Sequence, residues 1–171
     1  QPITDIIPKC LVNYQQHTVL KHLHDLYKNL GADKIIVVVH SKFKSIVSGY
    51  ADYMGLDIEI QTVDDIKGSM HAIQSLSGLN GNIVFNWCDV IPTFNNFSWD
   101  ENVIYTHGGG CRFNFDGTEL VSATYGNVVG VYQVKDFEYF AARRGVEGID
   151  FVEFLEPKKF KQGKLKSVVD I

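Results

Sequence analysis

The sequence lacks most features that would place it in a specialised class of protein. Its 171 residues include only three cysteines, at positions 10, 88 and 111, and this odd number at wide spacing indicates neither a disulfide framework nor a CxxC zinc site. No apolar run approaches the roughly 18 residues of a membrane span, and no signal peptide is visible. The net charge of -4 argues against non-specific nucleic-acid binding. We therefore expect a cytoplasmic protein with no nucleic-acid or membrane partner.

What is present is ordinary for a globular protein. Hydrophobic residues make up 45% of the chain and charged residues 21%. A chain of this length can bury about two-thirds of its unfolded surface, which is enough for one hydrophobic core. We expect residues 1–171 to form a single domain.

The first half alternates between helix and strand patterns. Apolar residues at helical spacing predict helices over 18–31, 42–55 and 69–76. Strand patterns lie between and after these helices, over 34–40, 56–63 and 82–90. The first and last of the strand patterns are continuous apolar runs, which are typical of strands buried on both faces. This βαβ order predicts a parallel, doubly wound sheet.

The second half has a different pattern. Strand-like segments cover 102–107, 111–123, 127–134 and 166–171, and Asp116-Gly117 predicts a hairpin turn. Helices are expected over 134–145 and 148–157. The segment THGGGC resembles an esterase oxyanion loop, but the chain has no G-x-S-x-G elbow, so we interpret residues 108–110 as a flexible connection. The basic segment 157–166 is interpreted as a solvated turn. The pattern as a whole predicts an α/β sandwich with an antiparallel addition in the second half.

A few residues have the chemistry of a binding site. Asp89 and Asp170 each end a predicted strand, where ligands of α/β sheets bind. Two such carboxylates could share one Mg²⁺, although a lone acid at a strand end is also a common loop cap. Gly68-Ser69 opens a helix and suits a nucleobase edge or a phosphate, or is a simple serine cap. Lys9, which follows a proline, is either a surface lysine or a positive charge directed at a ligand.

Five short segments stand out in order along the chain. They read ITDIIPKCL, KGSMHAI, IVFNWCDVIP, GNVVGVYQV and KSVVDI. Their order and spacing, over essentially the whole chain, resemble those of the nucleotidyltransferases that activate sugar phosphates. The resemblance implies a Rossmann-like three-layer α/β/α sandwich with a mixed, mainly parallel sheet. It also implies transfer of a nucleoside monophosphate from an NTP to a sugar phosphate, with release of pyrophosphate.

The resemblance assigns roles to individual residues. Lys9 matches the catalytic lysine that contacts the phosphates, and Asp89 and Asp170 match the aspartates that hold the Mg²⁺ cofactor. Gly68 and Ser69 fall on the nucleotide-binding segment. The implied acceptor-binding residues are Asn127, Gly130, Glu147 and Asp150.

The resemblance is incomplete at both ends of the chain. In the family, a strand and a glycine-rich loop, GGxGTRL, come directly before the segment that residues 3–11 match, and glycine usually follows the last matched segment. Neither is found here. We therefore expect a single catalytic domain that is truncated at both ends.

Several alternatives stay open from the sequence. The acceptor, a phosphorylated small molecule, could be phosphocholine instead of a sugar phosphate, which would make the protein a cytidylyltransferase. The chain could also be a non-catalytic nucleotide- or sugar-binding module of the same fold. Which NTP is used, and whether the protein is a homo-oligomer, are not indicated by any segment.

Overall fold

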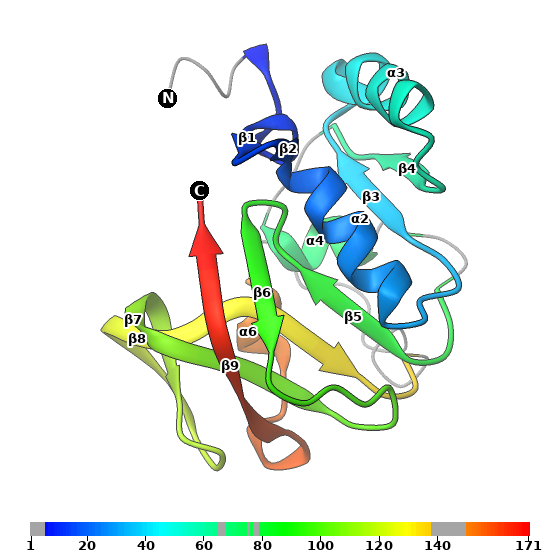
Figure 1. Ribbon diagram of the computed structural model, residues 1–171. Helices are drawn as coiled ribbons and strands as arrows, with labels where there is room; N and C mark the ends of the chain where they lie inside the picture. Colours follow the sequence, from blue (N-terminus) through cyan, green and yellow to red (C-terminus); the bar gives the residue numbers. More distant parts are fainter. Residues whose placement is uncertain (1–5, 65–67, 75, 77–78, 138–149) are drawn as a thin grey trace.

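The computed structural model describes residues 6–64, 68–74, 76, 79–137 and 150–171 (Figure 1). The helices are α2 (Val19–Asn29), α3 (Lys44–Met54), α4 (Ser69–Gln74) and α6 (Phe151–Phe154), with 3₁₀ turns at Lys9–Leu11, Ser41–Phe43 and Pro157–Lys159. The strands are β1 (Asn13–Tyr14), β2 (His17–Thr18), β3 (Ile36–Val39), β4 (Glu59–Thr62), β5 (Ile83–Asn86), β6 (Val90–Phe94), β7 (Val103–Phe115), β8 (Leu120–Val134) and β9 (Lys161–Asp170). Within the described ranges, no helix is both long and apolar enough to cross a membrane.

The first half follows the predicted order of helices and strands. Helix α2 begins after Thr18, whose Oγ1 accepts a hydrogen bond from the amide of Lys21 at 3.2 Å, an N-cap. Helix α3 ends at Gly55, which has the left-handed conformation that favours glycine, with φ +63°. Strands β3 and β4 are parallel, with Ile36 opposite Glu59, so β3, α3 and β4 form a complete βαβ unit.

The main sheet differs from the prediction. Among the described residues it has five strands in the order β5-β8-β7-β9-β6, and β3 and β4 form a separate two-stranded sheet. Of the strand pairs described in the main sheet, β7–β9 is parallel, whereas β5–β8, β7–β8 and β6–β9 are antiparallel. The prediction of a mainly parallel sheet is therefore wrong for these five strands, because β5 pairs with the returning arm of the β7–β8 hairpin.

The β7–β8 hairpin is the predicted antiparallel addition. Its turn is confirmed, since Asp116 Oδ1 accepts hydrogen bonds from the amides of Thr118 and Glu119 at 2.8 and 2.9 Å. Two loop predictions were wrong. Residues 108–110 belong to β7, where the pairing with β8 shifts register, and the segment 157–166 is mostly strand β9. The helix expected over 134–145 falls mainly on residues outside the described ranges.

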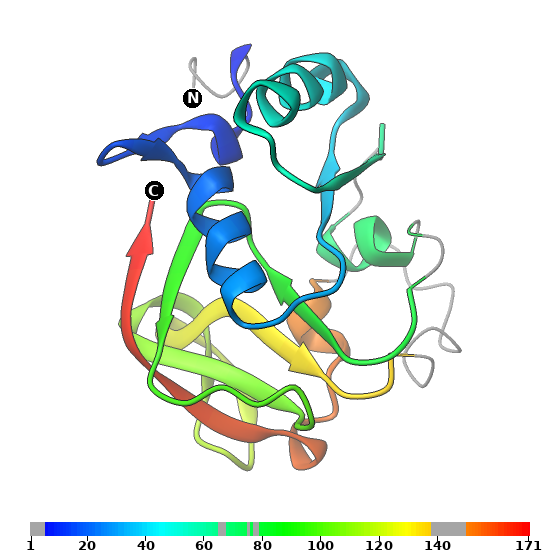
Figure 2. The same cartoon turned by 45° about the vertical axis from the view of Figure 1, so that its right-hand side comes forward.

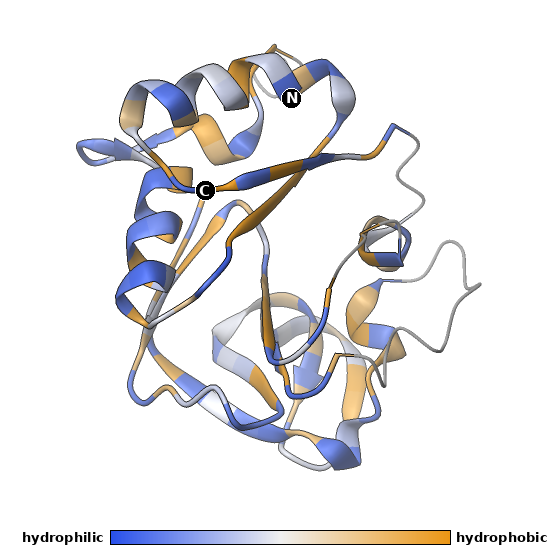
Figure 3. Ribbon diagram, turned by 90° about the vertical axis from the view of Figure 1, so that its right-hand side faces the viewer, coloured by the Kyte–Doolittle hydropathy of each residue, from blue (hydrophilic) through white to orange (hydrophobic). Residues whose placement is uncertain are grey.

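The strands of the main sheet carry many hydrophobic residues (Figure 3), and their side chains form two buried clusters, one on each face of the sheet. Ile104 and Tyr132 contribute to a cluster that includes Met70 of α4 and Phe151 of α6. Their neighbours Val103 and Val131 belong to a second cluster on the opposite face, as the alternation of side chains along a strand requires. A third cluster lies between α2, β3 and α3.

Candidate functional site

Lys9 and Asp89 form an ion pair near the end of β5. The Lys9 Nζ to Asp89 Oδ2 distance is 2.6 Å, and the two side chains are 45% and 16% exposed, respectively. Pro8 precedes Lys9 with φ -65° and ψ 145°, so the chain arrives extended before the 3₁₀ turn that begins at Lys9. The hydrogen bond to Asp89, followed by the Coulombic attraction of the same carboxylate, raises the pKa of Lys9 above its ordinary value. Lys9 is therefore a cation throughout the neutral range.

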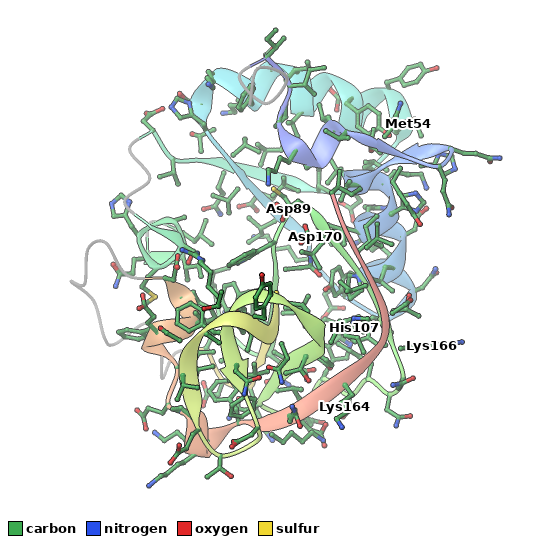
Figure 4. All side chains as sticks on the ribbon, turned by 90° about the vertical axis from the view of Figure 1, so that its left-hand side faces the viewer. Met54, Asp89, His107, Lys164, Lys166 and Asp170 are labelled. Carbon is green, nitrogen blue, oxygen red and sulfur yellow. The ribbon has the colours of Figure 1, made fainter. Side chains whose placement is uncertain are left out.

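Asp170 lies on the strand beside Asp89. It ends β9 and is paired with Val90 of β6, and the amide of Ile171 donates to the carbonyl oxygen of Asp89 at 3.0 Å. Asp89 and Asp170 are neighbours in the side-chain view (Figure 4). The negative charge of Asp170 also contributes to the raised pKa of Lys9. The structure thus brings together three of the predicted site residues, a lysine and two aspartates, from positions far apart in the sequence.

The charge and donor set of this cluster suit a divalent cation held with phosphates. Within the described residues, no three His, Cys, Asp or Glu side chains are gathered around one point. Two carboxylates are nevertheless enough for Mg²⁺, which completes its octahedral shell with phosphate and water oxygens. Asp89 and Asp170 therefore fit such an ion as a pair of oxygen donors, with Lys9 as an additional positive charge.

The turn that carries Asp89 is held by residues that sequence reasoning missed. The Asn86 side-chain amide donates to the carbonyl oxygens of Trp87 and Val90 at 2.6 and 2.8 Å, and so closes the turn around Asp89. The amide oxygen of Asn86 accepts a hydrogen bond from the hydroxyl of buried Tyr27 at 2.7 Å. Helix α2 thus fixes the geometry of the turn. The available signal was the asparagine itself, a polar residue in an otherwise apolar strand.

Gly130, a predicted acceptor residue, lies against Trp87. It has φ +77°, and a Cβ placed there would lie 2.6 Å from the Trp87 ring. The carbonyl oxygen of Gly130 accepts a hydrogen bond from the Trp87 amide at 3.0 Å. Because Gly130 has no side chain, the indole of Trp87 can pack on β8. Trp87 stands two residues before Asp89.

Asn127, the other predicted acceptor residue of β8, is bonded to the neighbouring strand. Its side-chain oxygen accepts from the Phe115 amide at 2.8 Å, and its side-chain nitrogen donates to the Phe115 carbonyl at 3.0 Å. These two bonds bridge β7 and β8 next to the register shifts in the hairpin.

Three of the remaining predicted residues, Gly68, Ser69 and Asp150, lie at a second place, between α4 and α6. The Ser69 hydroxyl accepts from the Phe151 amide at 2.7 Å and donates to Asp150 Oδ1 at 3.5 Å. Asp150 also forms an ion pair with Arg112 of β7, with 2.7 Å between Asp150 Oδ2 and Arg112 Nη2. The sequence did not indicate Arg112 as a site residue. Gly68 lies directly before α4 with φ +98°. The structure thus joins a predicted nucleotide residue, Ser69, to a predicted acceptor residue, Asp150. Glu147 lies outside the described residues.

Comparison with known proteins identifies the fold. The structure of inositol-1-phosphate CTP transferase from T. maritima matches with a TM-score of 0.71 and 10% identity, over 99% of this chain and 82% of that chain. A protein from Bacillus anthracis assigned as a glucose-1-phosphate thymidylyltransferase matches with a TM-score of 0.78 and 14% identity, over 99% of this chain and 83% of that chain. The fold is that of the sugar-phosphate nucleotidyltransferases. The resemblance found in the sequence is thereby confirmed.

A sequence match points the same way over a shorter length. UTP–glucose-1-phosphate uridylyltransferase AglF of Haloferax volcanii is 35% identical over 74 residues, which are 43% of this chain. The match spans 30% of that relative's length. No protein-family model matches the chain. The nucleotidyltransferase likeness thus rests on the fold over nearly the whole chain and on sequence over part of it.

Proposed function

We propose that this chain belongs to an enzyme that transfers a nucleoside monophosphate from an NTP to a sugar phosphate, giving a nucleotide-sugar and pyrophosphate. The observation that carries the proposal is the contact of Lys9 with Asp89, beside Asp170, in a chain with a nucleotidyltransferase fold. The proposal includes a cytoplasmic location and the three-layer α/β/α arrangement of a single domain.

The proposed reaction requires little proton transfer by the protein. The acceptor phosphate is already a nucleophile at neutral pH, so no general base is required. The difficulty is to bring two polyanions together and to stabilise the charge that develops on the attacked phosphate. Lys9 is suited to that task, because its raised pKa keeps it cationic and its ammonium is at the site.

Asp89 and Asp170 would hold the metal ion in this proposal. A bound Mg²⁺ supplies positive charge to phosphate oxygens. Asp89 has a second role that needs no metal, since its carboxylate orients the Lys9 ammonium. The turn closed by Asn86 and braced by Tyr27 keeps that carboxylate in position. Gly68 and Ser69 are proposed to contact the nucleotide, and Asn127, Gly130, Glu147 and Asp150 the acceptor.

Pyrophosphate release by the full-length protein tests the proposal. Each of the four NTPs is offered with glucose 1-phosphate, inositol 1-phosphate or phosphocholine in the presence of Mg²⁺, and omission of the acceptor is the control. We expect acceptor-dependent pyrophosphate release with at least one NTP and a sugar phosphate. Pyrophosphate release with phosphocholine but with no sugar phosphate would mean that the acceptor is phosphocholine or a similar compound instead of a sugar phosphate. Absence of release from every combination, with nucleotide binding retained, would favour a non-catalytic binding module.

A further inference from the structure

Trp87 is a large aromatic residue that is held at the surface beside Asp89. It is 39% exposed. Its amide donates to the carbonyl oxygen of Gly130 at 3.0 Å, and its own carbonyl oxygen accepts from the Val90 amide at 3.1 Å. A Cβ placed at Gly130 would lie 2.6 to 2.9 Å from the indole atoms Cδ2, Cγ and Cε3. The indole is therefore fixed against the backbone of β8 while more than a third of the residue is open to solvent.

The indole lies on the face of the main sheet that carries α4 and α6. Trp87 extends the pairing of β5 with β8 by one residue, and side chains alternate between the two faces along a strand. Phe85, two residues earlier, packs on Phe151 of α6 with ring centroids 4.6 Å apart. Asn86 bonds instead to Tyr27 of α2. Helices α4 and α6 cover one face of this sheet and α2 packs on the other (Figures 1 and 2).

Trp87 adjoins both groups of predicted site residues. Along the chain it stands two residues before Asp89, which holds the Lys9 ammonium. On the α4 and α6 side it lines the same cavity as Ser69. The Ser69 hydroxyl in turn donates to Asp150. The indole therefore borders the charged cluster at the end of β5 and the polar contact between α4 and α6.

This combination of groups is complementary to a phosphorylated sugar. A pyranose has apolar C–H faces and a rim of hydroxyl groups, so it suits an aromatic surface with a few polar groups at its edge. The Asp150 carboxylate can accept hydrogen bonds from hydroxyls and the Arg112 guanidinium can donate to them, and these two groups are 2.7 Å apart. The trimethylammonium group of phosphocholine can also lie on an indole, as a cation. It has no hydroxyls for Asp150 and Arg112, so the site favours the sugar.

The two tryptophans of the chain differ in how fully their rings are engaged. Trp99 donates its indole N–H to the carbonyl oxygen of Leu30 at 2.7 Å, and its ring packs edge-on against Phe97 with centroids 4.9 Å apart. Within the described residues, the indole N–H of Trp87 has no hydrogen-bond acceptor. Trp87 therefore keeps a free donor as well as exposed ring surface.

We propose that the indole of Trp87 is the surface on which the sugar ring of the acceptor lies, so that Trp87 selects a sugar phosphate over phosphocholine. The identity of the ligand rests on the proposed nucleotidyl transfer. A C–H face of the sugar contacts the indole, and the acceptor phosphate is directed toward Lys9 and Asp89. Trp87 takes no part in bond making or breaking, so its loss weakens acceptor binding and leaves the chemical step unchanged.

Kinetics of two replacements at this position test the proposal with the NTP and acceptor that support pyrophosphate release. Trp87→Leu stays apolar but has no aromatic face, and it should raise the KM for the acceptor about tenfold. Its kcat and its KM for the NTP should change by no more than a few fold. Trp87→Phe keeps an aromatic ring and should restore most of the acceptor affinity. An unchanged acceptor KM in Trp87→Leu, or a raised KM for the NTP in its place, would overturn the proposal.

Tryptophan fluorescence tests the contact without turnover. Glucose 1-phosphate, inositol 1-phosphate and phosphocholine are titrated into Trp99→Phe and, as the matched control, into Trp87→Phe. Each titration is repeated with the α,β-methylene analogue of each NTP, which cannot transfer its nucleoside monophosphate. We expect glucose 1-phosphate or inositol 1-phosphate to change the emission of Trp99→Phe but not that of Trp87→Phe. Because Trp99→Phe retains Trp87, this measurement also tests the proposal if Trp87→Leu does not fold.

The proposed transfer and the proposed sugar surface fail in different ways. A response of Trp87 to glucose 1-phosphate or inositol 1-phosphate without any pyrophosphate release would contradict the transfer and support the sugar surface. Pyrophosphate release without a response of Trp87 would support the transfer and overturn the sugar surface. A response to phosphocholine but to neither ring compound would also overturn the sugar surface, as would the same response in both variants.

Discussion

At the scale of single residues, the contact between Lys9 and Asp89 is the feature on which activity should depend most. The change Asp89→Asn removes the charge that orients the lysine at 2.6 Å and one of the two proposed metal ligands. Loss of one such preorganised contact typically lowers kcat by about 10² to 10³. Asp100→Asn is the control, because Asp100 is 79% exposed and lies 3.9 Å from its partner Lys135. Turnover of Asp89→Asn within a few fold of wild type at saturating Mg²⁺ would contradict the metal assignment.

The pH dependence of this contact separates a catalytic effect from a folding effect. Asp89 raises the pKa of Lys9, so the stability that the pair contributes is fully present below the ordinary lysine pKa of 10.5 and is lost only as pH rises through the folded value. Such a partly exposed pair contributes at most about 1 kcal/mol. Lys9 stays protonated from pH 6 to 9, so pH does not change this contact in that range. The ratio of the wild-type kcat to the kcat of Asp89→Asn should therefore be constant between pH 6 and 9.

Sequence could indicate the charged residues of the site but not their support. Lys9, Asp89 and Asp170 stand at recognisable places, after a proline and at strand ends. The hydrogen bond from Tyr27 to Asn86 joins residues 59 positions apart. No local sequence pattern links these two residues, because a tyrosine on the apolar face of a helix is interpreted simply as a residue of the hydrophobic core. The contact depends on how α2 packs on β5.

At the scale of elements, Gly130 of β8 and Gly49 of α3 should respond oppositely to replacement by alanine. A Cβ at Gly130 would lie 2.6 Å from the Trp87 ring, on a backbone with φ +77°, whereas at Gly49 nothing lies within 4 Å. Gly130→Ala should lower the free energy of unfolding by about 1–3 kcal/mol and change the tryptophan fluorescence. Gly49→Ala should raise it by about 0.5–1 kcal/mol, because glycine is unfavourable inside a helix. Urea unfolding measures both, and changes of the same sign would contradict this packing.

Local sequence patterns predicted most of the helices and strands correctly, but they did not predict how the strands pair. The caps at Thr18 and Gly55 act within a few residues, so the sequence around them is sufficient. The partner of β5 is chosen by the path of the β7–β8 hairpin, which no periodicity within 82–90 encodes. Residues 108–110 were mistaken for a loop, because glycine has no strand preference of its own and is held in β7 by its neighbours.

At the scale of the whole molecule, burial acts in the same direction on several weakly acidic side chains. Desolvation raises the pKa of Cys10 to about 12 and that of Tyr105 to about 12. It also raises the pKa of Tyr27 and Tyr132 above the ordinary tyrosine value of 10.0. These residues come from the 3₁₀ turn at Lys9, α2, β7 and β8, so the effect is spread through the fold.

Stability should therefore fall in alkali before the folded protein loses these protons. The unfolded chain releases the thiol proton of Cys10 near pH 9.0 and the tyrosine protons near pH 10.0, while the folded chain retains them. Because the unfolded state then binds fewer protons, the free energy of unfolding decreases as pH rises, by up to about 1.4 kcal/mol per pH unit for each such group. Urea unfolding at pH 8, 9, 10 and 10.5 should give a progressive decline that steepens above pH 10. Tyrosinate absorbance should reach its full value, for all eight tyrosines, only when the chain unfolds. A constant free energy of unfolding up to pH 10.5 would show that these side chains are accessible to water.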